Sequence, residues 1–363
     1  MKKILFVASH RPNRAPAQRF RFEQFIDFLE KNGFHSVHSH FISDYDDKYL
    51  YRKGAYFQKF RILIKAILVR LKDISRANEF DIIFIQREAF LLGSTYFERR
   101  FSKSKAKLVY DFDDSIWLND TSNANKKLRW LKYPGKIDTI ISISDMIFAG
   151  NKYLANYASY YNSNVKVVPT TIDTDWHKRK IYRTPDDTPV CIGWTGSITT
   201  IKHFEFAVPV LLKLKEKYGN KISFKVIGDA NYKNEEMGIT GIPWNKDTEI
   251  EELSTLDIGI MPLPNDEWSK GKCGLKGLQY MSLEIPAIMS PVGVNSEIIT
   301  DGINGFLAKN DQDWFEKLSL LIDNFELRQT IGKEARKTII DKYSKDSEKG
   351  NYIKYFNELL QVK

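Results

Sequence analysis

Residues 274–293 read GLKGLQYMSLEIPAIMSPVG. Glycines bound the stretch, and an amphipathic segment, a proline and a short apolar run lie between them. This order predicts a glycine turn, a helix, a strand and a second turn, which is a repeating unit of a parallel α/β sheet. Lys276 and Gln279 lie on the helix beside the first turn. We single them out because packing alone does not require either side chain.

The same alternation of apolar runs and amphipathic segments extends over the 363 residues. Strands are expected at residues 3–9, 80–86, 107–114, 137–144 and 165–171, and again at 190–196, 222–229, 256–263 and 285–290. Helices are expected at 19–34, 56–73 and 204–219, and from Asp311 onward. The pattern predicts an α/β fold of two Rossmann-like, doubly wound domains that face a cleft.

The length of the chain exceeds one ordinary hydrophobic core, so we expect two domains. The first spans residues 1–172 and the second spans residues 189–340. The polar stretch 173–188, which contains Pro185, is predicted to be a linker. Residues 341–363 are predicted to form a helix that packs back on the first domain.

The composition is that of a soluble globular protein, with 42% hydrophobic and 28% charged residues. Cys191 and Cys273 fit no disulfide framework and no metal-ligand spacing, which favours a reducing cytoplasm. The first apolar run is short and is followed at once by His10 and Arg11, so we interpret it as a buried strand and not as a signal peptide. The chain contains no apolar stretch long enough to span a bilayer.

The net charge of +9 is unevenly distributed. Residues 1–180 hold 32 Lys and Arg against 19 Asp and Glu, whereas residues 181–363 hold 23 against 27. The first half is therefore at +13 and the second at −4. This asymmetry suggests an anionic partner for the first half, such as a membrane surface, a phosphorylated lipid or nucleic acid, and the alternative is a solvated basic surface.

The second half resembles the nucleotide-sugar-binding domain of glycosyltransferase family 4, the group 1 glycosyl transferases, which have the GT-B fold. The similar segments are DIGIMPL at residues 257–263, KCGLKGLQYMSLEIPAIMSPVG at 272–293 and SEIITDGINGFLA at 296–308, and they occur in the family's order. The first half is similar from its first strand to VVPTTID at 167–173. The resemblance therefore covers nearly the whole chain.

The resemblance implies a nucleotide-sugar donor site in the second domain. Negative charge grows on the leaving diphosphate as the glycosidic bond breaks, and a helix N-terminus with a fixed cation stabilises that charge. Lys276 is the expected catalytic cation. The other expected donor-binding residues are Gly196, Ser197, Lys202, Asp229, Gly274, Leu275 and Gln279. For the turn at Gly196, an ordinary strand-to-helix connection is the structural alternative.

The sequence departs from the family's pair of glutamates separated by seven residues. Gln279 aligns with the second glutamate, which holds the donor ribose in the family, and an amide can still donate and accept hydrogen bonds. Gly271 aligns with the first, for which Asp266 or Glu267 is a candidate substitute. How the sugar hydroxyls are recognised is therefore open.

Acceptor-binding residues are expected in the first domain. Arg11, Arg14, Arg19 and Arg21 follow the first strand, and arginine makes bidentate contacts to phosphate oxygens. Asn151 is a further candidate, with a helix N-cap as the alternative. Asp113 and Asp114 end the third predicted strand and are expected to orient the acceptor or to stabilise a cationic transition state. Magnesium binding by these aspartates is the less favoured interpretation.

Residues 56–73 have a broad apolar face, and Gln58, Arg61, Lys65 and Lys72 lie on the opposite face at helical spacing. A basic amphipathic helix of this kind can lie on an anionic membrane. Packing on the sheet with the polar face in water is the alternative.

The function expected from these features is transfer of a sugar from a nucleotide-sugar donor to a glycan or lipid-linked acceptor in surface polysaccharide synthesis, with retention of configuration. No metal, no cofactor and no nucleic acid are expected to take part, and the expected location is the cytoplasm or the inner face of the cell membrane. A GT-B sugar-nucleotide epimerase and a non-enzymatic binder of anionic polymers are the alternatives.

Overall fold

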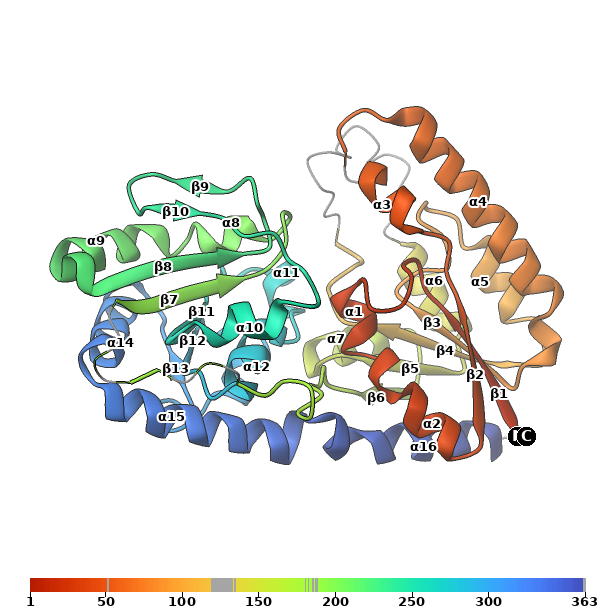
Figure 1. The fold of residues 1–363 in the computed structure, drawn as a ribbon. Helices are drawn as coiled ribbons and strands as arrows, with labels where there is room; N and C mark the ends of the chain where they lie inside the picture. The colour runs from red at the N-terminus through yellow and green to blue at the C-terminus, as the bar shows by residue number, and fades with distance from the viewer. Residues whose placement is uncertain are drawn as a thin grey trace. The chain divides into compact units, whose positions relative to one another are not determined.

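The computed structural model describes residues 1–50, 52–118, 133, 135–179, 181, 183–184, 186 and 189–361. The chain divides into two compact units (Figure 1). Unit 1 comprises residues 1–170 and 348–363, and unit 2 comprises residues 171–347. The predicted linker 173–188 falls partly outside the described residues, as do positions 362 and 363 of the predicted C-terminal helix.

Unit 1 is built on a six-stranded sheet in the order β2-β1-β3-β4-β5-β6, and all neighbouring strands are parallel. The strands are β1 (Lys2–Val7), β2 (Phe34–Ser39), β3 (Ile82–Gln86), β4 (Lys107–Phe112), β5 (Met146–Ala149) and β6 (Val165–Val167). The side chains of residues 4–7 in β1, 82–85 in β3 and 108–112 in β4 are fully buried, because helices cover both faces of the sheet.

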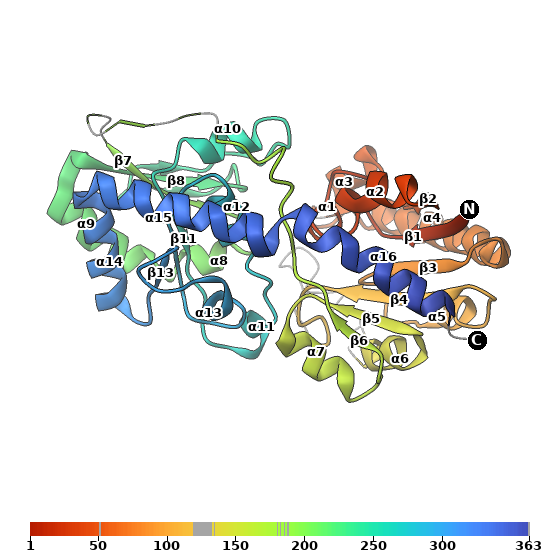
Figure 2. The ribbon, with the colours of Figure 1, turned by 90° about the horizontal axis from the view of Figure 1, so that it is seen from below.

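The helices of unit 1 are α1 (Pro16–Arg19), α2 (Ile26–Lys31), α3 (Asp44–Leu50), α4 (Tyr56–Ser75), α5 (Tyr96–Phe101), α6 (Lys136–Ile143), α7 (Lys152–Ser159) and α16 (Lys345–Gln361). On one face, Leu29 of α2 and Tyr352 and Phe356 of α16 share a core with Phe84 and Phe148 of the sheet. Figure 2 shows α16 running along this sheet. Helix α4 packs against α5, which packs against α6.

Three predictions for unit 1 need correction. Residues 137–144 are not a strand, because residues 136–143 form α6, whose Ile137, Ile140 and Ile141 are buried at helical spacing. Strand β2 was not predicted, since it lies at the edge of the sheet and its sequence FHSVHS is mostly polar. The predicted helix 19–34 is divided into α1, a 3₁₀ turn at Glu23–Phe25 and α2.

Unit 2 is built on a five-stranded parallel sheet in the order β13-β12-β11-β7-β8. The strands are β7 (Val190–Thr195), β8 (Ile222–Ile227), β11 (Ile258–Met261), β12 (Ala287–Met289) and β13 (Phe306–Leu307), and β9 (Lys233–Asn234) pairs with β10 (Ile239–Thr240) in a small antiparallel ribbon. The prediction of two α/β units with parallel sheets is thus confirmed.

The helices of unit 2 are α8 (Ile201–Phe204), α9 (Val208–Tyr218), α10 (Glu249–Ser254), α11 (Glu267–Lys270), α12 (Leu275–Ser282), α13 (Asn295–Ile298), α14 (Asp311–Asp323) and α15 (Phe325–Thr338). A π-helical turn at Ile339–Tyr343 leads into α16. Helices α8, α9 and α14 contribute to one core, and α12 packs on β11, β12 and α15. The helical C-terminal stretch after Asp311 is confirmed.

Strand order locates the ligand-binding edge in each unit. In unit 1 the order reverses between β1 and β3, and in unit 2 it reverses between β7 and β11. The loops that leave the carboxyl ends of such a strand pair diverge to opposite faces and open a crevice that binds ligands in doubly wound folds. The loops after β1, β3, β7 and β11 are therefore the places to look for a site.

Candidate functional site

The turn at Gly274 starts α12 in unit 2. Gly274 has φ of 72°, and a Cβ there would lie 2.4 Å from the Ile298 side chain, so glycine is required for both backbone and space. Helix α12 begins at Leu275, and its first backbone N–H groups have no partners within the helix. Such a helix start attracts anions.

Tyr280 fixes α12 to the central strand of the unit 2 sheet. Its hydroxyl accepts a hydrogen bond from the backbone N–H of Thr195 at 2.8 Å and lies 3.4 Å from the carbonyl oxygen of Ile260. The side chain is fully buried. The start of α12 is thereby held in register with the turn that follows β7.

The ring of Trp194 lies against both the turn that follows β7 and the side chain of Lys276. A Cβ at Gly196 would lie 2.2 Å from the Trp194 ring, so the turn after β7 packs directly on this indole. The Lys276 ammonium lies 5.4 Å from the centroid of the same ring, within cation–π range. Lys276 and Gly196, which are far apart in the sequence, are therefore neighbours.

Three lysines converge on buried His203 of α8. Burial, and after it the positive charges of Lys276, Lys272 and Lys202, lower the pKa of His203 to about 4. The opposing effect of Asp266 is smaller. His203 is therefore neutral near pH 7, and its depressed pKa reports a positive potential at this edge of the sheet.

Ser197 and Asp229 lie in turns beside these lysines. The backbone N–H of Ser197 donates to Thr200 Oγ1 at 2.9 Å, and Ser197 is exposed. Asp229 follows β8, and its Oδ1 accepts from the backbone N–H of Asn231 at 2.9 Å, which is an Asx turn. At Gly228 a Cβ would lie 2.0 Å from the carbonyl oxygen of Gly196, so these two turns touch.

Gln279 is turned toward Glu249, a residue that the sequence analysis missed. The Gln279 amide donates to Glu249 Oε1 at 3.1 Å, and the indole N–H of Trp244 donates to the same oxygen at 2.9 Å. Glu249 and Gln279 are each 5% exposed. Asp266 caps α11 by accepting from the backbone N–H of Ser269 at 2.7 Å, which gives it a structural role.

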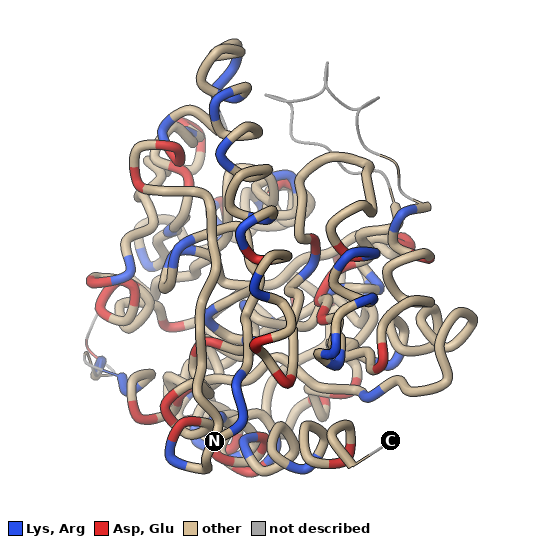
Figure 3. The backbone as a smooth tube through the Cα atoms, turned by 90° about the vertical axis from the view of Figure 1, so that its right-hand side faces the viewer, with Lys and Arg blue, Asp and Glu red and all other residues tan. Residues whose placement is uncertain are grey.

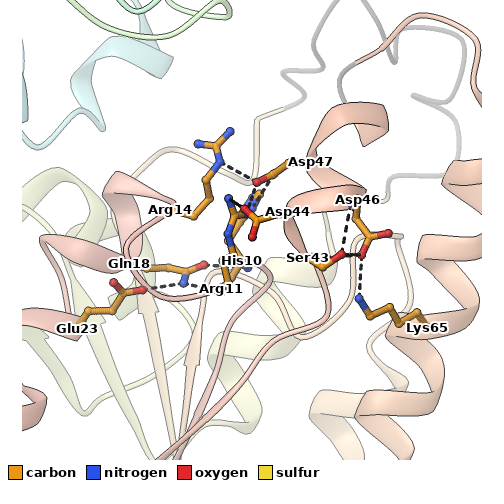
Figure 4. A network of polar contacts seen from close by, with 10 residues as sticks. All are labelled: His10, Arg11, Arg14, Gln18, Glu23, Ser43, Asp44, Asp46, Asp47 and Lys65. Atoms are coloured by element: carbon orange, nitrogen blue, oxygen red, sulfur yellow. Dashed lines mark hydrogen bonds and ion pairs between the residues drawn. The ribbon is translucent and has the colours of Figure 1, made fainter. Parts of the chain in front are cut away.

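In unit 1 the loop arginines are paired with carboxylates (Figure 4). Arg11 forms ion pairs with Asp44 and Asp47, and Arg14 Nε lies 2.8 Å from Asp47 Oδ2. The Asp44 side chain is 82% exposed, so this end of the network is open to solvent. Arg19 is 6% exposed, with its guanidinium 4.9 Å from the centroid of the Phe20 ring.

Two predicted acceptor residues have structural roles. The Arg21 side chain has no exposed surface, pairs with fully buried Asp111 and donates to the carbonyl oxygen of Val168. Asn151 is 3% exposed, and its Oδ1 accepts from the backbone N–H of Leu154 at 2.9 Å, so it is the N-cap of α7. Both side chains serve the packing of unit 1, and the expectation that they contact an acceptor stays a prediction.

Asp113 and Asp114 lie after β4 and both bind Arg87. Arg87 Nε lies 2.9 Å from Asp113 Oδ1, and Arg87 Nη2 lies 2.5 Å from Asp114 Oδ2. Arg87 has φ of 62°, a left-handed conformation that is uncommon outside glycine and concentrates at functional sites. Its position directly after the strand 80–86 was the sequence signal that could have identified it.

The structure thus gathers two groups of predicted residues. Gly196, Lys202, Gly274 and Lys276 meet in unit 2 at the edge formed by the ends of β7 and β11. Within unit 1, Arg11 and Arg14 follow β1, and Asp113 and Asp114 follow β4. Across the residues that are described, three or more His, Cys, Asp or Glu side chains nowhere gather in a group able to hold a metal ion.

Comparisons with known proteins agree with this architecture. Residues 189–324 match the family described as Glycosyl transferases group 1. An uncharacterized glycosyltransferase of Methanocaldococcus jannaschii is 24% identical over 309 residues, which cover 78% of this chain and 76% of that protein.

Solved structures share the fold over the full chain. A glycosyltransferase from Rickettsia africae gives a TM-score of 0.70 at 15% identity and covers 100% of this chain and 99% of its own. HepE of Anabaena, in complex with UDP-glucose, gives 0.67 at 13% identity and covers 99% of this chain and 100% of its own. The fold is GT-B, and residues 189–324 are similar to the group 1 glycosyltransferases.

Proposed function

We propose that the protein transfers a sugar from a nucleotide-sugar donor to a glycan or lipid-linked acceptor, with retention of configuration, in surface polysaccharide synthesis. One observation carries the donor assignment: Lys276 and Gly196 share the Trp194 ring, at the point where α12 begins. The diphosphate of such a donor can bind where a cation, a glycine backbone and the N-terminus of a helix lie together.

The proposed chemistry places the diphosphate oxygens at this group. The bond between the anomeric carbon and the phosphate oxygen breaks, and the negative charge that develops is stabilised by Lys276, by Lys202 and by the N–H groups of α12. The acceptor hydroxyl forms the new bond on the same face of the sugar, and its proton passes to the departing phosphate. No protein nucleophile is needed.

The acceptor is assigned to unit 1. Arg11 and Arg14 lie in the loop after β1, and an acceptor phosphate could compete with Asp44 and Asp47 for their guanidinium groups. Asp113 and Asp114 are proposed to orient an acceptor hydroxyl, with Arg87 holding both carboxylates in place. Direct contacts from Arg21 and Asn151 are not part of this proposal.

The first experiment screens nucleotide sugars by thermal shift, beginning with UDP-glucose because HepE of Anabaena binds it. Donors that stabilise the protein are then assayed for hydrolysis and for transfer to glycan acceptors. Lys276→Ala is compared with Lys213→Ala, which removes an exposed lysine of α9 in the same unit. Donor stabilisation and turnover lost only in Lys276→Ala support the proposal.

Two outcomes would contradict it. Conversion of the donor to an isomer in the absence of acceptor would identify an epimerase. Stabilisation by anionic polymers without any response to nucleotide sugars would indicate a binding protein. The thermal-shift screen therefore also contains anionic polymers, and each donor is also incubated with the protein in the absence of acceptor.

A further inference from the structure

Helix α4 presents apolar side chains to solvent. Phe57, Phe60, Ile64, Leu68 and Leu71 are 76%, 61%, 42%, 62% and 44% exposed. They are spaced three or four residues apart, so they form one stripe along the helix. The 20 residues of α4 correspond to about 30 Å of helix. We call these five residues the α4 stripe.

The opposite face of α4, which is buried, carries charges. Lys59, Arg70 and Asp73 are buried there alongside Ile62 and Ala66. This distribution reverses that of an ordinary surface helix, whose apolar side faces the protein core. The exposed stripe therefore requires an explanation, because scattered single hydrophobic residues are common on surfaces but continuous stripes are not.

Arg70 fixes this orientation of the helix. Its Nε donates to the carbonyl oxygen of Ala89 at 2.7 Å, its Nη2 donates to that of Ala8 at 2.6 Å, and its Nη1 pairs with Asp73 at 2.9 Å. Rolling α4 to hide the stripe would break these bonds and leave a buried charge unpaired, which is strongly unfavourable. The stripe is held outward by the fold itself.

Basic side chains flank the α4 stripe on one side. Arg61, Lys65 and Lys72 each directly follow a stripe residue in the sequence. Residues 52–76 contain eight Lys and Arg and one Asp, and that Asp is buried. Figure 3, which views unit 1 from the side where α4 lies in Figure 1, shows Lys and Arg recurring along this helix. Arg99 and Arg100 of neighbouring α5 are also exposed.

We infer that the α4 stripe inserts into the surface of an anionic lipid bilayer. An interfacial helix of this kind buries its apolar face at the boundary of headgroups and acyl chains, while basic residues at its edge contact acidic headgroups. A second copy of the chain is the weaker candidate, because a twofold pairing of the stripes would bring the two basic flanks together.

This inference differs from the expectation drawn from sequence. There the face that carries Gln58, Arg61, Lys65 and Lys72 is expected to contact the membrane. In the structure Arg61 Nη2 and Lys65 Nζ lie 2.7 and 2.8 Å from the oxygens of buried Asp46 (Figure 4 shows the Lys65 contact). Reversing their charge would disrupt this network, so such variants do not test lipid binding cleanly.

The test is vesicle co-sedimentation of the full chain. Phe60→Ser combined with Leu68→Ser removes two stripe residues. As a matched control, Phe206→Ser combined with Leu320→Ser removes a Phe and a Leu of unit 2 that are 56% and 46% exposed. Vesicles contain phosphatidylcholine alone or with phosphatidylglycerol. Binding of the unmodified protein to the anionic vesicles is expected to fall about tenfold or more in the stripe variant and to stay unchanged in the control.

Salt distinguishes insertion from surface adsorption. Raising the ionic strength weakens the contribution of the basic flank but leaves the apolar contribution, so binding should fall only in part. Equal binding by the stripe variant and the unmodified protein would overturn the inference, as would no binding of the unmodified protein at low ionic strength. A dimer that the stripe variant abolishes, without vesicle binding, would assign the stripe to a second copy instead.

Unfolding of the double variant would be detected by its melting curve, and Leu68→Gln alone then replaces it. The inference is independent of the proposed donor chemistry, because vesicle binding is measured without turnover.

Discussion

The cationic side chains of the two units lie in different surroundings. In unit 1, Arg11, Arg21 and Arg87 are each paired with carboxylates. In unit 2, the pKa of His203 is lowered by burial and then by the positive charges of Lys276, Lys272 and Lys202. The difference teaches that positive charge alone does not identify an anion site.

The largest expected effect comes from the buried pair of unit 1. Arg21→Met leaves Asp111 buried without a counter-ion, and we expect a loss of about 3–5 kcal/mol in the free energy of unfolding. Chemical denaturation measures this change. Arg21→Met combined with Asp111→Leu should recover most of the loss, and a single variant as stable as the unmodified protein would show that the pair is not structural.

In unit 2 we expect the removal of a cation to affect sugar transfer and not stability. Lys276→Ala is expected to lower the rate of sugar transfer about a hundredfold or more, because the charge it offsets is greatest in the transition state. Steady-state assays measure the rate, and the melting temperature should stay unchanged. Near-normal turnover would remove Lys276 from the mechanism.

The pKa of His203 responds to the charges around Lys276 and Lys202 in unit 2. Binding of a nucleoside diphosphate without added metal should raise its pKa from about 4, because the anion offsets the charge of the lysines. NMR titration of the ring measures the shift. His38 in unit 1, whose pKa burial also lowers to about 4, is the internal control and should not respond. A shift in both residues would point to a global change.

The low pKa of His203 also gives a pH dependence. Protonation of the His203 ring is less favourable in the folded state than in the unfolded state. The contribution of His203 therefore lowers the free energy of unfolding as the pH falls from 6.5 toward about 4.

The smallest expected effect on stability is that of Arg11→Met. Its partner Asp44 is 82% exposed, and its second partner Asp47 keeps its ion pair with Arg14, so we expect a loss of no more than about 1 kcal/mol. If the loop binds a phosphorylated acceptor, the same variant should raise the KM for that acceptor and leave donor binding unchanged. An unaltered KM would remove Arg11 from acceptor binding.

Local pattern was enough to predict most of the fold. The run Gly274–Gly293 forms the turn, helix and strand expected from its glycines and apolar spacing. The failures have physical causes. Residues 137–144 are rich in β-branched side chains, but tertiary packing places Ile137 and Ile140 on the buried face of a helix. Edge strand β2 lacked an apolar signal because it packs on one side only.

The site was less predictable because side-chain partners are distant in sequence. The motif indicated Lys276 and Gln279, but nothing in it showed that Glu249 accepts a hydrogen bond from the Gln279 amide. Arg21 appeared in a basic loop, whereas its partner Asp111 lies 90 residues away. Spacing identifies which residues share a helix face, and it does not reveal which charges the rest of the chain neutralises.

The return of α16 to unit 1 has a consequence for biosynthesis. Tyr352 and Phe356 complete the core around Phe84 and Phe148, yet they are translated only after the whole of unit 2. The unit whose synthesis begins first is therefore the last that can finish folding. Until α16 emerges from the ribosome, the aromatic face of the unit 1 sheet lacks part of its cover, and a nascent chain at that stage presents a surface that chaperones bind.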